Sequence, residues 1–146
     1  MARKVDWKAV KDIAATVFST KDCTIDPEGL ERLERLLVSV GFRRLDSGRH
    51  RLAFLSPSGR NVVKVPINDF GVLDNGREST RWGRRAEMWP LARCRLFCDG
   101  LLLVMEAVEI LPNWTFSDLP EWAKWIDGGQ VGLNRKGEFV AYDYAD

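Results

Sequence analysis

The sequence has no apolar run long enough to cross a membrane. The nearest candidate, "LLLVMEAVEI", is far shorter than the roughly 20 residues of a membrane-spanning helix, and it contains two glutamates. The first residues, "MARKVDWKAVKD", carry charges throughout and have no apolar core, so we expect no secretory signal peptide. These absences predict a protein that acts without a membrane.

Cysteine and histidine are also scarce. The chain has three cysteines, Cys23, Cys94 and Cys98, and one histidine, His50. An odd number of cysteines without a Cys-x-x-Cys pair is typical of reduced thiols in a cytoplasm rather than of a disulfide framework. Cys94 and Cys98 with a single histidine make a poor zinc site, which favours a packing role for both.

Neither sign of charge is in excess. The 22 lysines and arginines nearly balance the 21 aspartates and glutamates, which leaves a formal net charge of +1. Nothing in this balance indicates nucleic acid or an acidic membrane surface as a partner. The composition, 45% hydrophobic and 29% charged over 146 residues, is that of one globular domain spanning residues 1–146.

Helical spacing of apolar residues predicts two N-terminal helices within residues 1–42. The first covers residues 6 to about 20. The second begins after Asp26, a good N-cap, with Pro27 at its first position, and Gly41 stops it. Their apolar stripes consist of Val10, Ile13, Ala14, Val17 and Phe18 in the first helix, and Leu30, Leu33, Leu37 and Val40 in the second.

Turn residues then predict three hairpins. "RRLDSGRHRLAFL" and "RNVVKVPI" flank "SPSG"; "LARCRLFC" and "LLLVMEAVE" flank Asp99-Gly100; "QVGL" and "EFVAYDY" flank "NRKG". A helix over Val72–Trp89 separates the first two hairpins, and a short helix over Asp118–Ile126, with Asp118 and Glu121 as a capping box, precedes the third. The pattern predicts an α+β fold with a five-stranded antiparallel sheet, in which "RRLDSG" forms the extra strand and one helix follows the third strand.

Lys64 is a charge inside an apolar strand. Alternation puts it on the face opposite Val63 and Val65. In the following helix, Glu78 shares a stripe with Trp82, which predicts that Glu78 points toward the sheet; Ala86 and Trp89 continue that stripe. A buried charge needs a partner, so Lys64 and Glu78 are expected to pair. The alternative is that both side chains are exposed to water.

The order of elements and residues from Arg43 to Asp143 resembles the protein kinase fold, mainly its N-terminal lobe. More narrowly, "VVKVPINDFGVLDNGRES" is similar to small kinase-like proteins encoded by bacteriophages. The resemblance implies an N-lobe-like unit over residues 43–110 and a vestigial catalytic-loop and metal-site hairpin over residues 111–146.

The resemblance also implies roles for individual residues. Lys64 corresponds to the phosphate-binding lysine and Glu78 to the glutamate that pairs with it. Gly48 lies in the loop that covers the nucleotide, Met105 is at the gatekeeper position and Glu106 begins the hinge. Asp143, in "DYA" where kinases usually have Asp-Phe-Gly, corresponds to the metal-binding aspartate.

Departures from the kinase pattern concern catalysis. Only Gly48 remains of the several glycines that let a backbone approach phosphates. Gln130 replaces the metal-binding asparagine, and Trp125 stands where the proton-accepting aspartate belongs, with Asp127 nearby but out of register. Asp143 is followed closely by Asp146, so we expect neither an activation segment nor a large helical substrate lobe.

Basic residues gather around the middle helix. Arg81, Arg84 and Arg85, with Arg77, form either a solvated surface or a binding surface for an acidic protein or nucleic acid. The six tryptophans are expected mainly in the core, although an exposed tryptophan would indicate a protein interface.

These observations lead to a catalytically degenerate, pseudokinase-type binding protein. A phage-encoded chain of this kind is expected to bind and modulate a host protein in the cytoplasm of a bacterium, with a nucleic acid partner disfavoured. Two alternatives stay open. One is a minimal phosphotransferase that uses ATP and Mg, and the other is a nucleotide-binding sensor without catalysis. The sequence leaves open the identity of the partner, the oligomeric state and whether the two N-terminal helices replace the missing lobe. The phosphotransferase would use Lys64, Glu78, Asp127, Gln130 and Asp143.

Overall fold

The structure is a computed structural model that describes residues 5–19, 24–45, 48–84, 90–110, 119–125 and 130–143. It has three α-helices, a five-stranded antiparallel sheet and two two-stranded sheets within these ranges. The predicted α+β architecture, with a five-stranded antiparallel sheet and two preceding helices, is confirmed.

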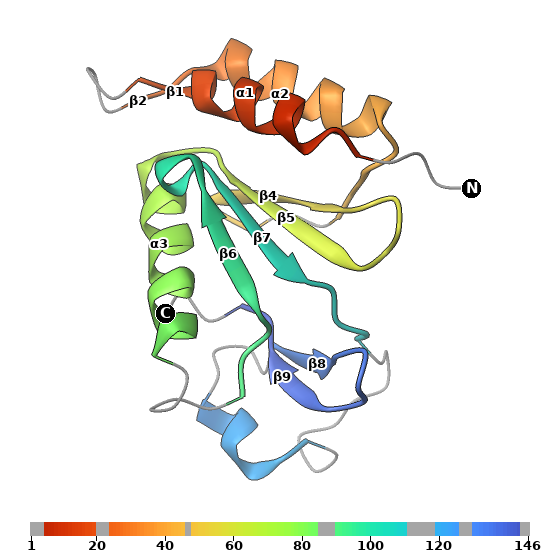
Figure 1. Ribbon diagram of the computed structural model, residues 1–146. Helices are drawn as coiled ribbons and strands as arrows, with labels where there is room; N and C mark the ends of the chain where they lie inside the picture. The colour runs from red at the N-terminus through yellow and green to blue at the C-terminus, as the bar shows by residue number, and fades with distance from the viewer. Residues whose placement is uncertain are drawn as a thin grey trace.

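The two N-terminal helices, α1 (Trp7–Val17) and α2 (Pro27–Ser39), lie side by side over the sheet (Figure 1). Asp26 caps α2 as predicted, because its side chain accepts a hydrogen bond of 3.3 Å from the Glu28 amide. The prediction that the first helix reaches residue 20 is wrong. It ends at Val17, since β1 (Phe18–Ser19) leaves the helix and pairs with β2 (Thr24–Ile25).

The five-stranded sheet has the order β3-β4-β5-β7-β6, with every neighbouring pair antiparallel. The first two predicted hairpins are β4–β5 and β6–β7, and the extra strand predicted from "RRLDSG" is β3. The register places Lys64 of β5 opposite Ala53 of β4 and Leu103 of β7, in the middle of the sheet. The bounds are β3 (Arg43–Arg44), β4 (Arg51–Leu55), β5 (Asn61–Pro66), β6 (Cys94–Phe97) and β7 (Leu102–Glu106).

The two faces of the sheet have different neighbours. One face packs on α1 and α2 in a core that includes Phe54, Val63 and Val65 from the sheet and Val10 and Leu33 from the helices. Since side chains alternate along a strand, Lys64 lies on the other face. That second face meets α3 (Asp69–Gly83), which Figure 1 shows beside the sheet, and a smaller apolar cluster around Leu103 and Met105.

The helix α3 begins at Asp69, not at the predicted Val72, because Asn68 caps it. The Asn68 side chain accepts a 3.0 Å hydrogen bond from the Gly71 amide. A Cβ at Gly71 would lie 2.7 Å from Pro66 Cβ, so only glycine lets the first turn of α3 approach the end of β5. The described helix ends at Gly83, and the predicted extension to Trp89 lies outside the described residues.

The third predicted hairpin is β8 (Val131–Leu133) with β9 (Phe139–Ala141), below the large sheet in Figure 1. It is tied to the rest of the protein by bridges from Leu133 to Glu109 and from Ala141 to Leu91. The segment before the hairpin contains a 3-10 helix, η4 (Glu121–Trp125), where a longer helix from Asp118 was predicted. Asp118 itself lies outside the described residues. Docking of the hairpin delivers the residues that follow β9 to the face of the sheet that carries Lys64.

The connection between β6 and β7 and the position of Cys94 are the remaining features of the large sheet. A 3-10 turn, η2 (Cys98–Gly100), connects β6 to β7, and Gly100 there has a positive φ of 100°. Cys94 is buried in the cluster that holds Met105, as expected from packing. Among the helices of the described ranges, none is both long enough and apolar enough to cross a membrane.

Candidate functional site

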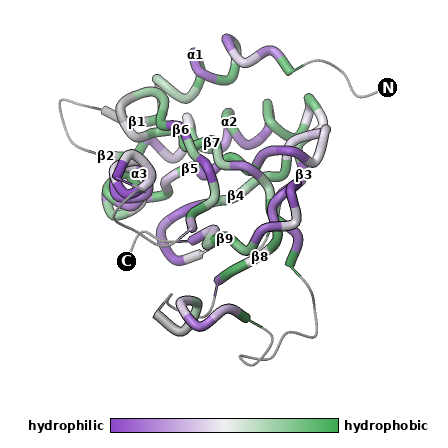
Figure 2. Tube along the Cα trace, turned by 60° about the horizontal axis from the view of Figure 1, so that its bottom comes forward, coloured by the Kyte–Doolittle hydropathy of each residue, from purple (hydrophilic) through white to green (hydrophobic). Residues whose placement is uncertain are grey.

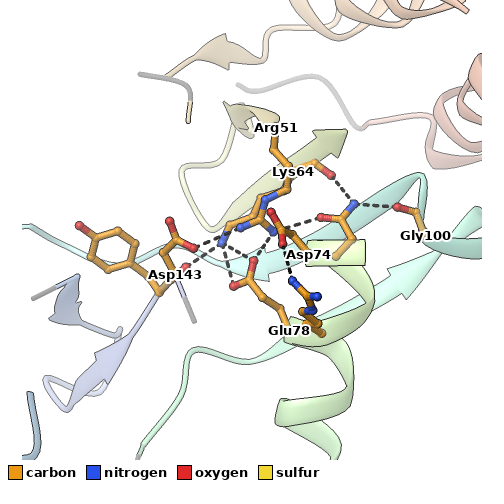
Figure 3. Close-up of polar contacts among 9 residues, drawn as sticks. Arg51, Lys64, Asp74, Glu78, Gly100 and Asp143 are labelled. Carbon is orange, nitrogen blue, oxygen red and sulfur yellow. Dashed lines mark hydrogen bonds and ion pairs between the residues drawn. The ribbon is translucent and has the colours of Figure 1, made fainter. Parts of the chain in front are cut away.

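Lys64 is buried at the centre of the sheet, with 8% of its surface exposed. Its Nζ donates hydrogen bonds to both carboxylate oxygens of Glu78, at 2.9 and 3.0 Å, and to the main-chain carbonyl of Tyr142, at 2.7 Å (Figure 3). The predicted pairing of Lys64 with Glu78 is therefore confirmed, and the alternative in which both side chains are exposed is wrong.

Arg51 of β4 is a second cation in this cluster. Its guanidinium forms an ion pair with Glu78, a 3.1 Å hydrogen bond with Asn75 Oδ1 and a 3.2 Å ion pair with Asp143 Oδ1. Arg51 and Lys64 reach the same carboxylate because Ala53, two residues after Arg51, lies directly opposite Lys64 in the register. Figure 3 shows these side chains converging from the sheet, from α3 and from the segment after β9.

Asn75 connects the cluster to the backbone around it. Its side chain is completely buried, and its Nδ2 donates to the carbonyls of Gly100, at 2.8 Å, and of Lys64, at 3.3 Å. Its Oδ1 accepts from Arg51. A buried amide with each of its polar atoms bonded is stabilising, whereas an unbonded one would be costly. Asn75 therefore fixes α3 to β5, β4 and η2 at one point.

The charges of the cluster balance. Lys64 and Arg51 supply two positive charges, and Glu78 and Asp143 supply two negative charges. Burial lowers the pKa of the Lys64 ammonium, Glu78 opposes this change, and the nearby Arg51 charge adds to it. Burial also raises the pKa of the Tyr142 hydroxyl, with the charge of Asp143 acting in the same direction. Buried charges persist only when paired, and this cluster supplies the pairs from the protein itself.

The sequence did not predict Arg51 or Asn75 as members of the cluster around Glu78. A signal for Asn75 was present, since it precedes Glu78 by one helical turn and so shares its face. Arg51 lies two residues before Ala53 and so on the same face of β4. This places Arg51 beside Lys64 only once the register of β4 against β5 is known. The stripe predicted beside Glu78 was aromatic, whereas the buried face of α3 consists of Gly71, Asn75 and Glu78. Trp82 is half-buried, and Ala86 and Trp89 lie outside the described residues.

The other residues implied for nucleotide binding are Met105, Glu106 and Gly48, and the contacts seen for them are with residues outside the charged cluster. Met105 is buried in the apolar cluster, opposite Val62 and Cys94. Glu106 accepts hydrogen bonds from the amide and the side chain of Arg93, at 2.9 and 3.4 Å. Gly48 is exposed, and a Cβ there would meet no atom within 4 Å. Contacts within the protein therefore do not require glycine at this position.

The two residues predicted for the metal site, Gln130 and Asp143, make hydrogen bonds within the protein. Gln130 accepts a 3.1 Å hydrogen bond from the Tyr142 amide through its main-chain carbonyl, and Asp143 pairs with Arg51. In the described parts of the chain, no group of three or more His, Cys, Asp or Glu side chains is placed to hold a metal ion. Asp127 and the Trp125 side chain lie outside the described residues. Of the arginines predicted to bind a partner, Arg81 and Arg84 lie on α3 and its C-cap, and Arg85 is outside the described residues.

The ammonium of Lys64 is engaged within the protein. An ammonium has three hydrogens to donate, and those of Lys64 are directed at Glu78, twice, and at the Tyr142 carbonyl. Two of the surface hollows, of about 580 and 650 Å³, are lined by residues other than Lys64, Glu78 and Asp143.

No family model, no curated protein and no solved structure matches this chain. The resemblance to protein kinases therefore stays a prediction, and the role of the cluster has to be argued from its own geometry.

Proposed function

We propose that the protein is a catalytically degenerate, kinase-like binding protein that acts by contacting another protein. One observation carries this proposal. The kinase resemblance gives Lys64 the role of binding a phosphate. Its ammonium instead donates three hydrogen bonds within the protein, two to Glu78 and one to the Tyr142 carbonyl. An ammonium whose hydrogens are bonded within the protein stabilises the fold and has no free hydrogen to offer a substrate.

The position of the cluster supports a structural role. Its members come from β4, β5, α3 and the residue pair after β9, so the network joins the hairpin β8–β9 to the sheet and to α3. In this proposal the protein keeps the kinase-like fold but lacks the catalytic residues. Its surface is then the part that acts, by binding another protein. The resemblance to phage-encoded kinase-like proteins makes a bacterial host protein the proposed partner, with the host cytoplasm as the place of action.

The test is a paired comparison in binding. The protein is used to capture partners from a bacterial lysate, and each candidate is purified and tested for direct binding. One variant carries Lys64→Met with Glu78→Gln, and a second carries Arg81→Glu with Arg84→Glu; circular dichroism and thermal melting verify that both are folded. We expect the first variant to keep binding the purified partner and the second to lose it.

The opposite result would replace this proposal. If the folded Lys64→Met, Glu78→Gln variant loses function, the charged cluster is the working part. Phosphate transfer from ATP that depends on Lys64 and Asp143 would then favour the minimal phosphotransferase. Nucleotide binding without transfer would favour the sensor.

A further inference from the structure

The outward face of α3 has a composition that the packing of the free protein does not explain. It lies opposite the buried Gly71, Asn75 and Glu78. Near its start, Phe70 and Leu73 are exposed by 62% and 53%, and α3 also carries hydrophilic stretches (Figure 2). A hollow of about 580 Å³ follows this face. It is lined by Val72, Leu73, Gly76, Arg77, Thr80, Arg81 and Arg84.

The exposed side chains of this face change from apolar to basic along α3. The apolar side chains of Phe70 and Leu73 lie in the first turns, and Arg77, Arg81 and Arg84 lie in the later ones. Basic residues near a helix C-terminus suit the helix dipole, which accounts for the arginines. The ring of Phe70 lies 5.2 Å from that of His50, yet more than half of Phe70 and of Leu73 stays exposed. The contact of Arg77 with Asp74 is long, at 3.5 Å, and exposed, so it leaves Arg77 able to exchange partners.

Gly76 is the most informative residue of this face. It occupies the interior of α3, where glycine destabilises a helix relative to alanine. Gly71 has a packing reason to be glycine, since a Cβ there would collide with Pro66. At Gly76 a Cβ would meet no atom within 4 Å. The free protein therefore gains nothing from this glycine, whereas a second backbone laid across the face would approach more closely because of it.

We propose that this face of α3 binds an amphipathic helix of the partner protein, with the partner helix antiparallel to α3. Its acidic N-terminal half lies against Arg77, Arg81 and Arg84, and its apolar C-terminal half covers Phe70 and Leu73. Two physical arguments set this direction. Acidic residues are favoured at a helix N-terminus, and antiparallel helices oppose their dipoles. This inference rests on the proposed binding function and specifies the chemistry of its partner.

The probe is a displayed library of helix-forming peptides of about 18 residues, slightly longer than α3. Selection is carried out in parallel on the wild-type protein, on Gly76→Gln and on Arg81→Glu with Arg84→Glu. We expect wild type to enrich peptides that are acidic in the first half and apolar in the second. These peptides should bind both variants about tenfold or more weakly. Gly76→Gln should at the same time raise Tm by about 2–4 °C, because glutamine is the better helix former.

A rise in Tm together with a loss of binding separates a blocked surface from a damaged fold. The inference is overturned if no peptide is enriched above an uncoated surface, or if enriched peptides bind the variants as well as wild type. A concentration-dependent dimer that Gly76→Gln abolishes would also overturn it, because a second copy would then occupy the face. If the captured host protein still binds both variants, the binding function stands and only this surface is wrong.

Discussion

Glu78 lies within 2.9 and 3.0 Å of the Lys64 ammonium through its two carboxylate oxygens, and it has no exposed surface. Lys64 comes from the middle strand of the sheet and Glu78 from the helix that covers it, so this contact fixes the position of α3. Arg51 binds the same carboxylate, which means that Glu78 keeps one cation if the other is removed. The consequences of substitution follow from that redundancy.

Substitution Lys64→Met should lower the free energy of unfolding by about 2 kcal/mol. Breaking a buried ion pair typically costs about 3–5 kcal/mol, because one charge is left unpaired, but here Arg51 still neutralises Glu78. Urea denaturation measures the change. Lys8→Met is the matched control, since Lys8 pairs with Asp12 on the exposed surface and its loss should cost far less than that of Lys64. Equal losses in the two variants would contradict a buried, energetically important Lys64.

Substitution Asn75→Ala should lower the free energy of unfolding by about 2–3 kcal/mol. It removes hydrogen bonds to Gly100, Lys64 and Arg51, and it leaves a buried carbonyl without its donor. Thr80→Ala on the exposed side of α3 is the control and should change stability by less than about 0.5 kcal/mol. If Asn75→Ala costs no more than the control, Asn75 does not anchor the helix.

The sequence predicted the sheet better than it predicted the charged cluster. Hairpins carry local signals, such as Asp99-Gly100 between β6 and β7, and alternation around Val63 and Val65 assigns Lys64 to the face away from α1 and α2. These properties depend on residues that are close in sequence, so they can be inferred from one chain.

The cluster depends on residues that are far apart in sequence. Asp143 reaches Arg51 only because the hairpin β8–β9 docks on the segments around Glu109 and Leu91, a tertiary arrangement with no local signal. The buried face of α3 was also misjudged. A helix usually buries its apolar stripe, but α3 covers charged and polar groups of the sheet and buries Asn75 and Glu78 instead.

Addition of ATP and Mg should leave the Tm of the wild-type protein unchanged. A ligand present at about 100 times its Kd would add about 2.7 kcal/mol to stability, an effect readily seen as a rise in Tm. No rise is expected, because the hydrogens of Lys64 are engaged by Glu78 and Tyr142. Incubation with labelled ATP should likewise transfer no label, either to the protein or to generic substrates. A thermal shift or labelling that disappears in both Lys64→Ala and Asp143→Ala would count decisively for a working nucleotide site.

The last prediction concerns pH and the ammonium of Lys64. Burial lowers its pKa below the ordinary value of 10.5, so the folded protein holds this proton less tightly than the unfolded chain does. Between the lowered pKa and 10.5 the unfolded state binds more protons, and the contribution of Lys64 to the free energy of unfolding therefore rises with pH. Tyr142 acts in the opposite direction, because its pKa is raised above 10.0 and its contribution falls as pH rises through 10.0.

Tyr142→Phe removes that opposing contribution, so the comparison is made between Tyr142→Phe and the double variant Tyr142→Phe, Lys64→Met. Urea denaturation of both proteins from about pH 7 up to 10.5 gives the difference in their free energies of unfolding, in which titration of all other groups cancels. We expect this difference to grow in favour of the protein that retains Lys64 as pH rises. A flat difference would mean that attraction to Glu78 balances burial, and a shrinking one that it outweighs burial. The folded protein would then hold the Lys64 proton at least as tightly as the unfolded chain, and Lys64 would stabilise the fold as an ordinary, strongly charged ion-pair partner.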